Sequence, residues 1–151
     1  KVITGQVGSA SFIMIYEDTS IRVYNNSVFR LVSERYSLLN HSELALFEGK
    51  VIIEADDNLG YSFILNTPST KATVSGTNFL AEYQEDLLFN GVDYSIFTVL
   101  EGIIELENLN SNLSMYLLDG ETVVSTDSGK FLRLDTFREP QGIVNSLLEF
   151  R

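Results

Sequence analysis

The sequence predicts an all-β domain, either a sandwich or a β-roll of many short and mostly antiparallel strands. Three observations favour this fold class. Short runs of β-branched and aromatic residues recur, Gly, Asn and Asp separate them, and few segments have the apolar spacing of a helix. With 151 residues, of which 44% are hydrophobic, the chain is long enough to bury one core, so we expect a single domain over residues 1–151.

Alternation of apolar and polar residues sets the limits of the expected strands. In chain order they cover residues 21–24, 28–32, 44–47, 50–54, 61–65, 72–74, 78–83, 94–100, 103–106, 114–118, 122–124 and 130–134. The segment 101–107 shows the pattern well, since Glu105 and Glu107 alternate with Ile104 and Leu106. That strand should be wet on one face and packed on the other.

A pair formed by an acidic residue and a glycine occurs three times in the chain. The pairs Glu48-Gly49, Glu101-Gly102 and Asp119-Gly120 each separate two apolar runs. Because Gly adopts positive φ at little cost, these pairs predict tight turns.

In the C-terminal segment, Pro140 is followed by apolar residues at the spacing of a helix. The residues that carry this spacing are Ile143, Leu147 and Phe150. The pattern predicts a short C-terminal helix over residues 140–150.

Composition excludes several classes of partner. Twenty-one Asp and Glu residues against ten Lys and Arg give a net charge of −11, which argues against binding to nucleic acid or to an anionic membrane surface. No apolar stretch approaches the roughly 20 residues of a membrane helix, so we expect no membrane insertion. The chain begins with Lys1, so we expect a processed product that has lost a signal peptide.

No motif for catalysis or for a cofactor is present. The chain has no Cys, and its one histidine, His41, lies in a polar stretch typical of a turn. There is neither a Gly-x-Ser-x-Gly elbow nor a phosphate-binding loop. We therefore expect no enzyme and no cofactor. The carboxylates with the best case for Ca²⁺ are Asp56, Asp57, Glu85 and Asp86, but they lack EF-hand spacing, and solvated turns are the favoured interpretation.

A series of short motifs occurs in a fixed order along the chain. Its members are Glu48-Gly49-Lys50-Val51, Asn66-Thr67-Pro68, Gly76-Thr77 followed by Phe79, Val99-Leu100-Glu101-Gly102, and Leu118-Asp119-Gly120-Glu121. Thr67-Pro68 and Gly76-Thr77 can frame a small ligand notch. The favoured interpretation is structural, with Pro68 ending a strand at an edge and Phe79 packing in the core beside Ala81 and Tyr83.

Over residues 5–124 this series resembles the FecR domain. The resemblance implies an all-β domain of bacterial envelopes, in the periplasm or at the cell surface. The best-known members are periplasmic regulators that relay a signal from an outer-membrane transporter to a sigma factor through a membrane helix and a cytoplasmic segment. We recognise neither of those two parts in residues 1–151.

Two functional hypotheses of different class follow, with a third behind them. The first is a non-catalytic envelope or extracellular module that acts through protein–protein contacts. The second is a structural subunit that assembles with copies of itself into a surface fibre or layer. Its contacts would come from segments 1–16 and 125–151, which can equally cover the domain's own sheet; the residues concerned are Phe12, Met14, Tyr16, Ile143, Leu147 and Phe150. The third is a glycan-binding module that uses a tyrosine surface.

Overall fold

The structure, a computed structural model, describes residues 2–3, 10–14, 19–33, 41–55, 62–85 and 92–134. Every regular element in this part is a strand, so the predicted all-β class is confirmed. The predicted helix over residues 140–150 lies outside the described residues. Within the described ranges, nothing has both the helical length and the hydropathy of a membrane span.

The strands follow one another with short connections. Their bounds are β1 (Val2–Ile3), β2 (Ala10–Met14), β3 (Thr19–Val23), β4 (Val28–Ser33), β5 (His41–Ala55), β6 (Ser62–Asn66), β7 (Thr70–Val74), β8 (Asn78–Gln84), β9 (Tyr94–Glu101), β10 (Ile104–Asn108), β11 (Ser114–Leu117), β12 (Thr122–Thr126) and β13 (Phe131–Leu134).

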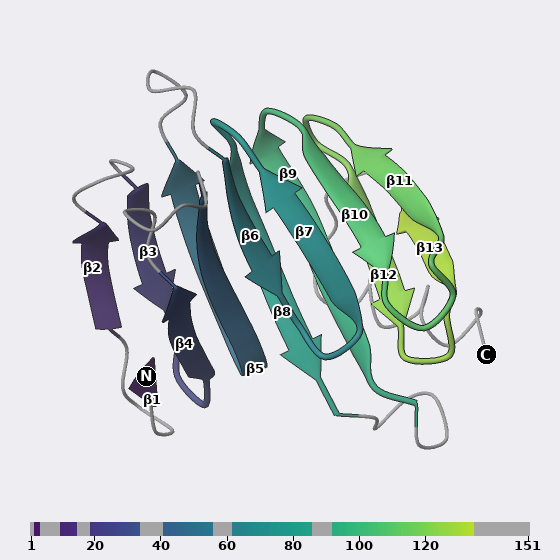
Figure 1. Cartoon of the computed structure of the whole chain (residues 1–151), viewed down its shortest axis with the longest axis horizontal. Coiled ribbons are helices and arrows are strands. Elements are labelled where there is room, and N and C mark those ends of the chain that lie inside the picture. Colours follow the sequence, from purple (N-terminus) through teal and green to yellow (C-terminus); the bar gives the residue numbers. More distant parts are fainter. Residues whose placement is uncertain are drawn as a thin grey trace.

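The strands form one sheet that is folded into two layers (Figure 1). The front layer, nearer the viewer, contains β1, β4, the first part of β5, β6, β7, β10 and β11. The back layer contains β2, β3, the rest of β5, β8, β9, β12 and β13. Neighbours are antiparallel except β5 and β6, which run parallel. The prediction of mostly antiparallel strands is therefore confirmed.

Strand β5 belongs to both layers. Its first residues pair with β6 in the register His41↔Ser62, and from Gly49 onward it pairs with β8 in the register Gly49↔Tyr83. The sequence predicted two strands, over residues 44–47 and 50–54, separated by a turn. The structure instead shows a single strand of 15 residues that changes layer at Gly49.

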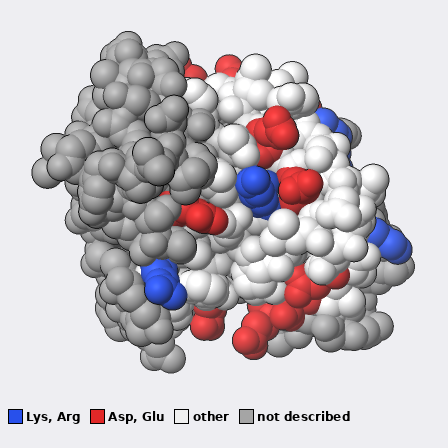
Figure 2. All heavy atoms as spheres, in the orientation of Figure 1, with Lys and Arg blue, Asp and Glu red and all other residues white. Residues whose placement is uncertain are grey.

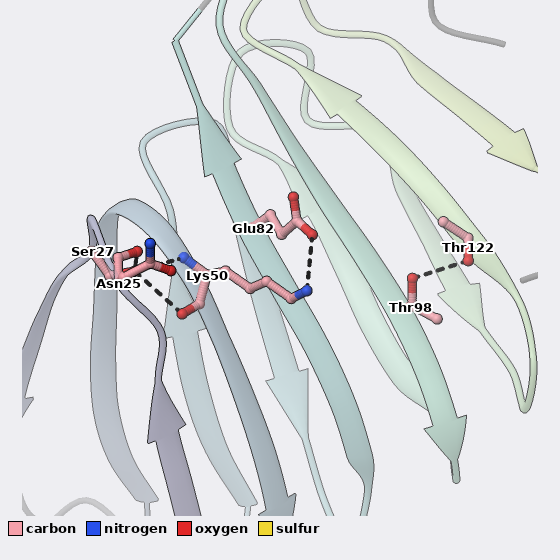
Figure 3. A network of polar contacts seen from close by, with 6 residues as sticks. All are labelled: Asn25, Ser27, Lys50, Glu82, Thr98 and Thr122. Atoms are coloured by element: carbon pink, nitrogen blue, oxygen red, sulfur yellow. Dashed lines mark hydrogen bonds and ion pairs between the residues drawn. The ribbon is translucent and has the colours of Figure 1, made fainter. Parts of the chain in front are cut away.

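Ser27 lies against Gly49 and fixes this change of layer. Figure 3 shows Ser27 between Asn25 and Lys50. The Lys50 N–H donates to Ser27 Oγ at 2.9 Å, and Ser27 Oγ in turn donates to the Asn25 carbonyl at 3.2 Å. Gly49 has φ of +93°, and a Cβ at this position would lie 2.5 Å from Ser27 Cα. Only glycine combines this backbone conformation with such a close approach.

The other acid–glycine pairs are also crossings between layers. Strand β9 lies in the back layer and β10 in the front layer, while β11 and β12 lie in front and back. Gly102 and Gly120 have φ of +108° and +77°, so the expected backbone conformation is confirmed. The predicted tight turn is present at Asp119-Gly120, where the Glu121 N–H donates to the Leu118 carbonyl at 3.0 Å. Neither glycine closes a hairpin, because the two strands on each side of it do not pair with each other. A glycine with positive φ serves a corner as well as a hairpin, so the local pattern could not distinguish them.

The core lies between the two layers and follows the predicted alternation. Phe79, Ala81 and Tyr83 of β8 are buried together, as expected. On β10, Ile104 and Leu106 are fully buried while Glu105 is exposed. The packed and wet faces of this segment were therefore predicted correctly.

Replacing Gly49 with Ala is expected to lower the free energy of unfolding by about 2–5 kcal/mol. The added Cβ must displace Ser27, which costs about 1–3 kcal/mol, and positive φ adds about 1–2 kcal/mol for a residue with a Cβ. Urea unfolding measures the loss. Gly120→Ala is the matched control: its φ is also positive but nothing lies within 4 Å of the added Cβ, so only the backbone cost of about 1–2 kcal/mol is expected. Equal losses in the two variants would contradict the importance of the Ser27 contact.

Candidate functional site

Exposed apolar side chains are concentrated in and beside the β10–β11 hairpin of the front layer and at the end of β9, the back-layer strand that precedes it. In the described part of the chain seven large hydrophobic residues are strongly exposed, and six of them lie in the stretch 100–118. We call these six side chains the β10–β11 edge surface; they are Leu100, Ile103, Leu109, Leu113, Tyr116 and Leu118. Single exposed hydrophobic residues are ordinary, but a contiguous group marks an interaction site.

Three layer crossings support the upper end of this surface in Figure 1. Thr77 Oγ1 donates to the Ile103 carbonyl at 2.8 Å, and the Gly102 N–H donates to Asp119 Oδ1 at 2.6 Å. The Gly120 N–H donates to the Val99 carbonyl at 2.8 Å. These hydrogen bonds link the three crossings to one another. The backbone around Ile103 is therefore held in place.

Strand β11 is the last strand of the front layer. In the described residues it pairs with β10 alone, so the other side of its backbone has no strand beside it. Arg133 of β13 reaches this side, donating to the Tyr116 carbonyl at 2.9 Å and to Glu121 Oε2 at 2.8 Å. An edge strand with exposed apolar side chains is a template for a further strand.

Carboxylates accompany the apolar side chains. Glu105 is exposed on β10 directly opposite Tyr116, and Glu101 and Asp119 are exposed at the upper rim. Figure 2 shows carboxylates dispersed over the face of the molecule that is nearer the viewer. The edge surface therefore combines apolar area with negative charge.

The Thr67-Pro68 motif forms a buried polar cluster and no ligand notch. Pro68 is exposed in the turn between β6 and β7, which are interior strands of the layer and not an edge as expected. Thr67 Oγ1 and Ser69 Oγ lie 2.7 Å and 2.6 Å from Ser95 Oγ of the back layer. Thr70 Oγ1 donates to Ser125 Oγ at 2.6 Å. These hydroxyls are buried and bonded to one another, so they join the two layers.

The other motif residues also have structural roles. Thr77 is buried and bonded to the next crossing, Phe79 is in the core, and Gly76 has φ of +60°. Glu101 is exposed and lies 3.5 Å from Asn78 Nδ2. None of these residues points to a ligand.

The Ca²⁺ candidates are not brought together by the described structure. Glu85 is exposed, while Asp56, Asp57 and Asp86 lie outside the described residues. The described ranges contain no group of three or more His, Cys, Asp or Glu residues with the geometry of a metal site. The preference for solvated turns over calcium binding stays an untested prediction.

Two carboxylates meet a buried tyrosine at the lower end of the sandwich. Tyr83 Oη donates to Asp127 Oδ2 at 3.0 Å and lies 3.4 Å from Asp93 Oδ2. Burial raises the pKa of Asp127, and the nearby Asp93 raises it further, against the lowering effect of the Tyr83 hydrogen bond. Burial also raises the pKa of Tyr83, which keeps its hydroxyl protonated as a donor. Asp127 Oδ1 is buried and has no hydrogen-bond partner.

A polar hollow of about 340 Å³ lies beside the change of layer in β5. Its lining residues are Tyr24, Asn25, Asn26, Glu48, Gly49, Lys50, Glu82 and Gln84. The Lys50 ammonium lies 4.8 Å from the centre of the Tyr24 ring and 3.8 Å from Glu82 Oε1. Lys50 and Glu82 of this hollow already pair with each other, so neither offers an uncompensated charge to a ligand.

The residues proposed for self-assembly are not tested by the structure. The backbone of Phe12 and Met14 lies in β2, which pairs with β3, but their side chains are not described. Tyr16, Ile143, Leu147 and Phe150 lie outside the described residues. Residues 125–134, part of the segment 125–151, pair within the back layer as the end of β12 and as β13. His41 is the first residue of β5. The prediction that it lies in a turn is therefore wrong.

Comparison with known proteins identifies the family. The model of the family described as "FecR protein" matches residues 1–105, which is more than half of the chain. The chain therefore belongs to the FecR family, as its motifs predicted. A search of curated proteins found no match.

Solved structures with the same fold include two crystal structures, at 1.65 Å and 2.50 Å resolution, of a protein from Parabacteroides distasonis described as a "putative anti-sigma factor". Each has a TM-score of 0.73 and 20% sequence identity to this chain. The match covers 89% of this chain and 59% of the other. The chain thus spans little more than half of the length of these proteins.

Ser95→Ala is expected to lower the free energy of unfolding by about 1–3 kcal/mol, because the buried hydroxyls of Thr67 and Ser69 both lose a partner. Chemical denaturation measures the change. Ser114→Ala, on exposed strand β11, is the control and should change stability little. A loss no larger than that of the control would contradict a stabilising role for the polar cluster.

Asp127→Asn is expected to stabilise the protein relative to the wild type more at about pH 7 than at about pH 3. The folded-state pKa of Asp127 is raised above its ordinary value of 3.8. The protonated carboxyl therefore contributes stability below that value, and this contribution is lost as the pH rises through the folded-state pKa. Asparagine does not titrate.

Urea unfolding of both proteins across this pH range measures the difference. Glu105→Gln removes one exposed negative charge and is the matched control. A stability difference for Asp127→Asn that is the same at every pH would exclude the expected coupling.

Proposed function

We propose that the chain is a non-catalytic module of the bacterial envelope that regulates by binding another protein, and that the β10–β11 edge surface is its docking site. The observation that carries the proposal is that five exposed hydrophobic side chains lie in or beside one edge hairpin, with a sixth, Leu100, at the end of the preceding strand β9. Membership of the FecR family supports the compartment and the regulatory class. The fold shared with a "putative anti-sigma factor" agrees with that class.

The chemistry of the edge defines the partner. The open side of β11 accepts an extended segment, because backbone groups there can pair with a further strand. Tyr116 and Leu118 offer apolar contact area, and Glu105 and Asp119 place negative charge beside it. The complementary partner is a protein segment with alternating apolar and Lys or Arg side chains. Displacement of Arg133 from the Tyr116 carbonyl frees the backbone acceptor that such a segment would use.

The two other hypotheses gain no further support. The fibre hypothesis depends on side chains in segments 1–16 and 125–151, and all six residues named for it have side chains that the structure does not describe. For the glycan hypothesis, Tyr116 is an exposed ring, yet its neighbours on the edge are aliphatic side chains and carboxylates. We therefore retain one proposed function.

Site-specific photo-crosslinking tests the docking site. A photoreactive residue at Tyr116, introduced in the organism that encodes the chain, is expected to give one discrete adduct with a different protein. The same residue at Arg22, exposed on β3 of the back layer, should give none. The purified partner should then bind Leu118→Asp at least tenfold more weakly than the wild type, and Arg22→Ala equally well, with an affinity that falls as salt increases.

Three results would overturn the proposal. Equal crosslinking at Tyr116 and Arg22 would exclude this edge as the docking site. An adduct of two copies of the chain would replace the separate partner with self-association. Undiminished binding by Leu118→Asp would show that the apolar side chains of the edge do not contribute.

A further inference from the structure

The back layer has a second apolar cluster, distinct from the core between the layers. Tyr94 and Ile96 of β9, Val124 of β12 and Leu134 of β13 are each at most 7% exposed and pack together. All five residues of β12 are buried. A strand that faces a partner layer on one side only should alternate between buried and exposed residues.

Alternation places this cluster on the face turned away from the front layer. Phe97 and Val123 belong to the core between the layers. Ile96 and Val124 are their direct neighbours along the strands, so their side chains point to the opposite face. The front layer therefore cannot be what covers Ile96 and Val124.

Polar groups show how far the burial extends over this outer face. Thr98 and Thr122 are 3% and 2% exposed, and their hydroxyl oxygens lie 3.0 Å apart (Figure 3). Glu82 of β8, directly opposite Ile96, is only partly buried, its side chain being 24% exposed. The buried area thus runs across β9 and β12 to β13 and ends toward β8.

We propose that residues 135–151 of the same chain cover this outer face. The segment begins next to Leu134, which is itself a member of the cluster. Its hydrophobic residues can replace water over the face: they are Phe137, Ile143, Val144, Leu147, Leu148 and Phe150. The tail is therefore part of the folded domain. The partner protein binds at the β10–β11 edge surface and not at the tail.

The length of the segment matches the face. Strands in a sheet lie about 4.8 Å apart, so crossing from β9 over β12 to β13 requires about 10 Å. An 11-residue helix over residues 140–150, as the sequence predicts, is about 16 Å long. Ile143, Leu147 and Phe150 lie on one side of such a helix, facing the sheet. The four or five residues after Leu134 are enough for the chain to reverse direction.

Other occupants are separable by experiment. Residues 86–91, which join β8 to β9, also carry hydrophobic residues, but only six residues are available and both of their ends are fixed. A second copy of the chain could supply its tail in exchange. These alternatives predict different responses to substitutions in the tail.

Hydroxyl-radical footprinting of three tyrosines in the full-length chain tests the proposal. In the wild type Tyr116, 61% exposed, should react fast, while Tyr83 and Tyr94, 5% and 6% exposed, should react slowly. In Leu147→Asp and in Ile143→Asp the oxidation rate of Tyr94 should rise at least fivefold, because a charged side chain cannot remain on the apolar face. The oxidation rate of Tyr83 reports on unfolding, and that of Tyr116 reports on the radical dose. Both rates should be the same as in the wild type. Arg151→Ala is the matched tail control.

The same experiment can overturn the proposal. If Tyr94 stays protected in both Asp variants while Tyr83 is also protected, residues 135–151 do not cover the face. If Asp variants expose Tyr83 too, a chain cut after Leu134 is mixed with a synthetic peptide of residues 135–151. A lower oxidation rate of Tyr94 when the peptide is added supports the proposal. An oxidation rate that does not change when the peptide is added excludes it. A wild-type mass of two chains by light scattering, with Tyr94 exposed on dilution to monomer, would assign the cover to the tail of a second copy.

Discussion

The contact between Ser27 and Gly49 is the constraint on which the rest of the sandwich depends. Strand β5 has neighbours on both sides in both layers: β4 and β6 in front, β3 and β8 behind. A shift in the position where β5 changes layer would therefore alter the register of four other strands. Gly49 permits the change by its positive φ and its missing side chain, and the Ser27 hydroxyl satisfies the Lys50 N–H that the bend leaves without a strand partner.

The two ends of the sandwich are closed by different means. At the upper end in Figure 1, the chain crosses between layers three times, and the crossings bond to one another through Thr77, Gly102, Asp119 and Gly120. At the lower end, the layers are joined by buried hydroxyls around Ser95. The exposed leucines and Ile103 near the upper crossings are thus held by backbone bonds. A docking surface that is already ordered loses less conformational entropy when a partner binds.

Most of the strands could be predicted from the sequence because each depends on local alternation. The inward positions of Phe79, Ile104 and Leu106 followed from the same pattern. Strand pairing could not be predicted, since corner and hairpin require the same glycine. The edge surface was missed for a related reason. Tyr116 and Leu118 are ordinary strand residues in the sequence, and only the topology shows that their strand is the last of its layer. One signal in the sequence could have indicated the edge surface. Apolar residues occur just before and just after a strand that also carries exposed acids.

The boundary of the family match separates scaffold from specificity. The FecR match ends at residue 105, inside β10, so it includes Gly49, the Thr67 turn and the first two of the three upper crossings. Four of the six side chains of the edge surface, from Leu109 to Leu118, lie beyond it. The match therefore includes β1 to β9 of the two layers, whereas β11, β12, β13 and four of the six exposed apolar side chains come after it. Exposed side chains at the edge can be exchanged without disturbing the core, so partner binding at this place does not constrain the packing of the two layers.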